Sequence, residues 1–176
     1  MGASFEDIRE LREMTSCGVI DCKKALEEAK GDMKKAQELL QKRGLEIAAK
    51  KSSRAALNGR VESYVHMGNK IAVLVQVNCE TDFVAKNADF SQFAKDLAMH
   101  IAAMNPAHIR EQDIPPEVLA QVKDQEAYIK EKCLLSQPFV KDPGKTIQDC
   151  LSALVAKIGE NIVISRFTRY EVGDVA

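Results

Sequence analysis

Two stretches of the sequence carry side chains whose types and spacing could support chemistry. Glu80 and Asp82 place two carboxylates close together, and Phe83 comes directly after them. Such a pair can supply a general acid and a general base when a dry cleft tunes their pKa values, but the neighbouring sequence indicates no cleft. The run 144–146 (Gly-Lys-Thr) matches the end of a phosphate-binding loop, which also requires glycine at position 139, where this chain has Phe. We therefore interpret this run as a loop that leads into a helix N-cap.

The cysteines and histidines form no pattern typical of a metal centre or a nucleophile. No two of the five cysteines make a CxxC pair, and none of the three histidines lies at zinc-binding spacing from a cysteine. We interpret the thiols as buried or half-buried side chains in a reducing compartment, which favours the cytoplasm. We expect no catalytic residue, no metal and no cofactor, and hence no enzyme.

Composition and charge exclude several other classes of protein. The chain has 176 residues with 45% apolar and 29% charged residues, as is ordinary for a globular protein. Its net charge of −1 gives no overall attraction to nucleic acid. No apolar run approaches the length of about 18 residues that a membrane span needs. The acidic start matches neither a signal peptide nor a transit sequence, so we expect neither.

The residues before Glu80 must position the polar turn. The run 73–77 is rich in valine and predicts a buried strand, which ends in polar residues from Asn78 to Asp82. Phe83 then has two interpretations. Its ring either turns inward and covers the core, which periodicity alone favours, or is presented with Asp82 to a partner.

Residues 1–44 predict a small helical domain. Ser4 and Asp7 form a capping box before the first helix, and Gly18, Gly31 and Gly44 are predicted to end three successive short helices. Three short helices bury only a marginal core. A unit of this kind is typical of a docking module.

Residues 45–60 predict a basic helical linker, with Glu46 as its only acid. Such a charge run is usually a solvated face, and the alternative is a patch for an acidic protein surface or for RNA. The stretch has no aromatic residue on which bases could stack, which weakens the RNA interpretation.

Residues 61–176 predict an α+β core domain. A β-hairpin covers 60–78, a helix begins at Asp89, and a thin amphipathic arm occupies about 110–133 as one helix or half of a coiled-coil hairpin. A Thr146-capped helix and a strand from Ile162 complete the chain. This order predicts a three-stranded antiparallel sheet packed with helices.

Several strings of residues resemble bacterial elongation factor Ts nearly from end to end. The most specific are Asp21-Cys22-Lys23-Lys24-Ala25-Leu26 and Asn78-Cys79-Glu80-Thr81-Asp82-Phe83-Val84-Ala85. The runs 137–140, 155–162 and 169–173 fit as well. The resemblance implies that the N-terminal helices form a ubiquitin-associated-like domain and that the function is guanine nucleotide exchange on elongation factor Tu.

The resemblance also implies roles for individual residues. Thr81, Asp82, Phe83 and Val84 would act on the GTPase, with Phe83 wedged between its helices and Asp82 reorganising the surroundings of its Mg²⁺. Secondary contacts to the GTPase would come from four further residues, Lys23, Lys51, His66 and Ile158.

One departure from the family bears on assembly. Longer members carry two copies of the sheet-and-helix core, and this chain has one, as the short members do. The resemblance therefore implies a homodimer that forms a 2:2 complex with elongation factor Tu, with no membrane and no direct nucleic-acid role. The alternative is a non-exchanging ribosome- or RNA-associated docking protein of the same fold.

Overall fold

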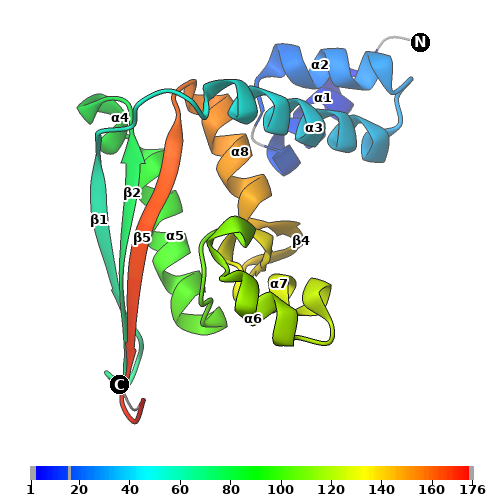
Figure 1. Cartoon of the computed structure of the whole chain (residues 1–176). Helices are drawn as coiled ribbons and strands as arrows, with labels where there is room; N and C mark the ends of the chain where they lie inside the picture. The colour runs from blue at the N-terminus through cyan, green and yellow to red at the C-terminus, as the bar shows by residue number, and fades with distance from the viewer. Residues whose placement is uncertain (1–2, 16, 175–176) are drawn as a thin grey trace. The chain divides into compact units, whose positions relative to one another are not determined.

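The computed structural model describes residues 3–15 and 17–174 (Figure 1). Their contacts divide them into two compact units. One contains the described residues up to Arg54 together with Leu151–Asn161, and the other contains Ala55–Cys150 and the described residues from Ile162 onward. Each unit has its own hydrophobic core and is described by itself.

The first unit is built on three helices, α1 (Phe5–Thr15), α2 (Val19–Glu28) and α3 (Met33–Lys51). The predicted capping box at its start is confirmed, since the Asp7 N–H donates to Ser4 Oγ (3.0 Å) and the Ser4 N–H to Asp7 Oδ2 (3.3 Å). Small and branched apolar side chains form the core: Leu11, Cys22, Ala25, Leu26, Ala29, Ala36 and Leu40.

The three glycines predicted to end these helices behave differently. Gly31 has φ +85° and donates its N–H to Leu26 O (2.9 Å), so it ends the second helix as predicted. The prediction for Gly18 is wrong, because its φ of −64° makes it the extended N-cap of α2. The prediction for Gly44 is also wrong. It lies buried inside α3, where the helix formers after it outweigh the roughly 1 kcal/mol cost of one glycine.

Helix α8 (Ile147–Ile158) contributes its residues from Leu151 onward to the first unit. Lys51 Nζ, at the end of α3, donates to Gly159 O (2.5 Å), and Asn161 Nδ2 donates to Arg54 O (2.7 Å). These bonds join segments more than a hundred residues apart in the sequence.

The second unit contains the predicted three-stranded sheet. Strands β1 (Asn58–Val65), β2 (Ile71–Cys79) and β5 (Ile162–Glu171) are antiparallel in the order β1-β2-β5 (Figure 1). Helix α5 (Ala88–Met104) packs on β1 and β2, on the face that buries the valines at 73, 75 and 77. The α+β class predicted from the sequence is confirmed.

Short elements link α5 to α8. They are η1 (Glu111–Asp113), α6 (Pro116–Gln121), α7 (Gln125–Lys132), η2 (Leu134–Ser136), β3 (Pro138–Phe139) and β4 (Asp142–Thr146). The arm, for which the sequence left one helix or half of a coiled-coil hairpin open, is therefore made of two short helices, α6 and α7. Neither of these has a buried residue.

Among the described residues, no helix combines the length and the apolar character needed to cross a membrane.

Candidate partner-binding site

The predicted site lies where β2 meets helix α4 (Asp82–Ala85). Thr81 is the N-cap in an extended conformation, and its Oγ1 accepts the Val84 N–H (3.4 Å). The helix stops after one turn, since the next residues lead directly into the N-cap of α5, where Asn87 Oδ1 accepts the Asp89 N–H (2.8 Å). A tight turn therefore separates a buried strand from a long helix.

Phe83 projects from this turn with 82% of its surface exposed. The interpretation that its ring covers the core is wrong, because the core takes its ring from the fully buried Phe90 of α5 instead. Val84 and Thr81 are half-buried beneath the turn. An exposed aromatic ring on a well-anchored turn is a typical anchor for protein recognition.

Asp82 is exposed beside the ring and pairs with Lys86 four residues on (Nζ–Oδ2, 3.0 Å). The hydrogen bond from Lys86 and its charge lower the pKa of Asp82. The carboxylate is therefore charged at neutral pH, which suits an electrostatic contact and not a general acid.

The base of the turn is held by groups that sequence analysis did not single out. The thiol of Cys79, which is buried, donates to Thr81 O (3.1 Å), and Asn58 Nδ2 donates to Glu80 O (2.7 Å). Only the antiparallel pairing of β1 with β2 brings Asn58 to this position, and no local sequence pattern could have indicated it.

The four secondary residues fall into two groups. Lys51 and Ile158 are brought close together in the first unit, since Lys51 bonds the carbonyl of the residue after Ile158. Lys23 is exposed on α2 of the same unit, within 3.9 Å of Glu27. His66 comes directly after β1 in the second unit, and its Nδ1 lies 3.0 Å from the hydroxyl of Tyr64.

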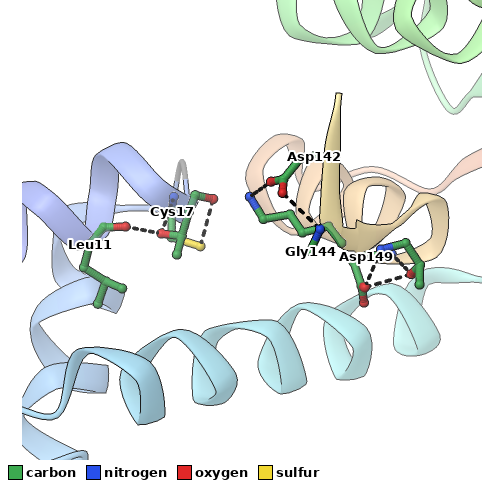
Figure 2. Close-up of polar contacts among 8 residues, drawn as sticks. Leu11, Cys17, Asp142, Gly144 and Asp149 are labelled. Atoms are coloured by element: carbon green, nitrogen blue, oxygen red, sulfur yellow. Dashed lines mark hydrogen bonds and ion pairs between the residues drawn. The ribbon is translucent and has the colours of Figure 1, made fainter. Parts of the chain in front are cut away.

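The run Gly144-Lys145-Thr146 forms the end of β4 and the cap of α8 (Figure 2). Lys145 Nζ is paired with Asp142 (2.9 Å). Thr146 Oγ1 accepts the Asp149 N–H (3.1 Å), and Asp149 Oδ2 accepts the Thr146 N–H (2.9 Å). The helix cap predicted at Thr146 is confirmed, but the predicted loop before it is wrong, because Asp142–Thr146 form strand β4, which pairs with β3.

Two of the described thiols are poorly suited to reaction, because a raised pKa disfavours the reactive thiolate. Burial raises the pKa of Cys22, and it raises the pKa of Cys150 to about 11. Cys17 donates its thiol to Thr15 O (3.7 Å), as Figure 2 shows. Within residues 3–15 and 17–174, no three His, Cys, Asp or Glu side chains gather as a metal site would require.

Comparison with known proteins matches the chain to one family along nearly its whole length. The family model described as elongation factor TS matches residues 6–127 and 124–174. The chain is 49% identical to elongation factor Ts of Alkaliphilus oremlandii and 47% identical to that of Carboxydothermus hydrogenoformans, with 95% of this chain and 88% of each relative covered. It is 45% identical to elongation factor Ts of Thermotoga neapolitana over 99% of both chains. The chain belongs to the elongation factor Ts family.

Proposed function

We propose that Thr81–Val84 is the part of this chain that acts on elongation factor Tu. Family membership carries the role itself: the chain is a guanine nucleotide exchange factor in translation elongation, which promotes release of GDP so that GTP can bind. The single observation that supports the assignment to the turn is the exposed ring of Phe83 on a capped, anchored helix start. No covalent step is asked of the chain, so it is not an enzyme.

The chemistry of a GTPase site explains how a small contact can release GDP. The nucleotide is held by a glycine-rich loop and by Mg²⁺, which requires near-ideal octahedral geometry. A ring inserted between helices near that site displaces the groups around the metal. Phe83 supplies the ring. The charged Asp82 supplies a carboxylate that competes for the hydrogen bonds of the GTPase groups around the metal.

Thermodynamic linkage sets the direction of exchange. A factor that binds the nucleotide-free GTPase better than the GDP form must, in turn, be expelled when nucleotide binds again. The turn therefore lowers the affinity for GDP without being consumed.

The open sheet face, formed by the exposed side of β1, β2 and β5, supports a homodimer. Alternate residues of these strands point away from α5, and four large ones are exposed: Val61, Val65, Leu74 and Tyr170. Monomers rarely expose a contiguous apolar patch of this kind. A second copy covering this face would give the 2:2 complex with elongation factor Tu. A monomer mass by light scattering at micromolar concentration would contradict the dimer.

The remaining contacts and the location complete the proposal. Lys23, Lys51, His66 and Ile158 make secondary contacts to elongation factor Tu. Residues 1–44 act as the docking domain, 45–60 as its basic connection and 61–176 as the exchange core. The cysteines are free thiols, the state that a reducing compartment such as the cytoplasm maintains, which supports a cytoplasmic location.

Release of a fluorescent GDP analogue from elongation factor Tu tests the assignment. The wild-type chain is expected to accelerate release, and Phe83→Ala to lose most of that acceleration while its circular dichroism is unchanged. No acceleration by the wild-type chain would favour the non-exchanging docking protein. Steeply salt-dependent binding to RNA alone would favour an RNA-associated role.

A further inference from the structure

Two asparagine side chains cross between β1 and β2 in opposite directions, at the end of the sheet that carries the turn. Asn58 Nδ2 donates to Glu80 O (2.7 Å), and Asn78 Nδ2 donates to Ala56 O (3.0 Å). In the strand pairing Asn58 faces Cys79, so each amide bonds a carbonyl just beyond the last rung of the ladder. We name this pair, Asn58 and Asn78, the amide clamp.

Gly59 allows the clamp to close. Its φ is +149°, and a Cβ at this position would lie 2.3 Å from Val77 O, closer than any side chain tolerates. The backbones of β1 and β2 therefore approach each other closely here. This approach is next to Asn58, whose short side chain then reaches Glu80 O.

A chain of polar side chains fixes the orientation of one half of the clamp. Arg166 on β5 can only donate, and its Nε bonds Gln76 Oε1 (2.9 Å). Gln76 must therefore present its Nε2 to Asn78 Oδ1 (2.9 Å), which leaves the Asn78 amide nitrogen for Ala56 O. All three strands thus contribute to holding the segment before β1 against the end of β2.

The other half of the clamp acts on the turn. Glu80 is the residue before the Thr81 N-cap, and the carbonyl of Thr81 is itself held by the Cys79 thiol (3.1 Å). A helix of one turn has too few hydrogen bonds to persist alone. The bonds to the carbonyls of Glu80 and Thr81 therefore help to set the direction in which Phe83 points.

We propose that Asn58 is a positioning residue for nucleotide exchange, which directs Phe83 and Asp82 by holding the carbonyl of Glu80. This inference rests on the proposed function of Thr81–Val84. Asn58 lies on β1, whereas the turn follows β2, and Asn58 acts on exchange only through the turn. Its loss therefore leaves the chain able to dock on elongation factor Tu. The GDP-release rate at saturation falls, and the concentration needed for half of that rate changes little.

Two variants remove the donor in different ways. Asn58→Ala deletes the amide, and Asn58→Asp keeps its shape but replaces the donor by an acceptor that repels Glu80 O. Gln92→Ala is the matched control, because it deletes the amide of an exposed residue that donates to Asp96 of the same helix, α5 (2.8 Å). Both Asn58 variants are expected to lower the saturating release rate by roughly threefold to tenfold, the effect of about one lost hydrogen bond. The control is expected to keep the wild-type rate.

A second readout is independent of elongation factor Tu. Amide ¹⁵N order parameters of residues 80–85 in the chain alone are expected to fall in both Asn58 variants and to stay unchanged in Gln92→Ala. Unchanged order, or wild-type release by both variants while Phe83→Ala is impaired, would overturn the role of Asn58 alone. If Phe83→Ala exchanges like wild type, the proposed function of the turn fails, and the positioning role fails with it.

Discussion

Two strands of this chain lead into a helix capped by threonine, and the two helices differ in the residues after the cap. At α8, Thr146 and Asp149 form a reciprocal capping box, and Ile147 is only 1% exposed. At α4, Thr81 caps a single turn, and Phe83, the aromatic residue of that turn, is 82% exposed. The same local chemistry therefore begins a packed helix in one place and, in the other, the exposed turn that we propose for recognition.

The difference lies in burial and not in capping. Helix α8 runs for twelve residues because its apolar side is packed, whereas α4 ends after four residues with none buried. A helix with no fully buried residue depends in part on bonds made by its neighbours, here the thiol of Cys79 and the amide of Asn58. Substitutions at α8 are therefore expected to affect folding, and substitutions at α4 to affect exchange.

The largest effect on stability is expected from Ile147→Ala. Deleting a fully buried isoleucine side chain removes packing and leaves a cavity, which lowers the free energy of unfolding by about 2–4 kcal/mol. Phe83→Ala, at an exposed position, is expected to change it by less than about 0.5 kcal/mol. Urea unfolding monitored by circular dichroism measures both. Equal losses of unfolding free energy in the two variants would contradict the difference between α8 and α4.

Acidification is expected to weaken the segment before α8 and to spare the turn. His100 is fully buried; its Nδ1 accepts the Val140 N–H (3.3 Å), so Nε2 carries the proton given to Gln137 Oε1 (3.0 Å). Burial lowers the pKa of His100 below 6.5, although the bond to Gln137 acts in the opposite direction. The unfolded chain therefore binds a proton first, and stability that is present above pH 6.5 is lost below it, by at most about 1.4 kcal/mol per pH unit.

Hydrogen exchange between pH 7.5 and 5.5, corrected for intrinsic rates, measures this effect. Protection of residues 137–147 is expected to fall more than that of residues 80–86. His100→Gln should abolish the difference, and His66→Gln should retain it. The opposite sign, with stability rising on acidification, would contradict the neutral buried His100.

The two caps are expected to differ in what their loss affects. Thr146→Ala removes one half of a capping box and should lower the free energy of unfolding by about 1 kcal/mol. Thr81→Ala removes the acceptor for the Val84 N–H, so it should slow GDP release with a smaller change in unfolding. Urea unfolding and the GDP-release assay are measured on both variants. A larger loss of stability in Thr81→Ala than in Thr146→Ala would contradict this expectation.

The smallest effect is expected from Lys86→Ala. Its partner Asp82 is exposed, so the unfolding midpoint should not change measurably. The pKa of Asp82 should rise toward its ordinary value, since the Lys86 hydrogen bond is the main cause of its lowering. A carboxyl ¹³C NMR titration measures this shift. An unchanged pKa would show that Lys86 does not hold the carboxylate.

Sequence reasoning succeeded where a few neighbouring residues decide the structure. The capping boxes at Ser4 and Thr146 depend on side chains three residues apart, and both are confirmed. The alternation of Val73, Val75 and Val77 likewise predicted the buried face of β2. The valine pattern can be recognised in the sequence because residues two apart in a strand lie on one face.

Prediction from the sequence failed where residues far apart in the chain decide the structure. Gly44 lies inside α3 next to the backbone of Ser152, a neighbour that only the tertiary structure supplies. Periodicity placed Phe83 in the core, although Phe90 fills it. Asn58 and Glu80 are 22 residues apart, and only strand pairing makes them partners.

The central claim is that the ring of Phe83 serves exchange and not folding. GDP release from elongation factor Tu at a saturating concentration of factor tests it, with Phe5→Ala as the matched control because Phe5 is 80% exposed. With Phe83→Ala, elongation factor Tu is expected to release GDP on the order of tenfold to a hundredfold more slowly than with wild type, while the unfolding midpoint of the variant is unchanged. With Phe5→Ala, release is expected at the wild-type rate. Equal release rates for Phe83→Ala and wild type would contradict the account.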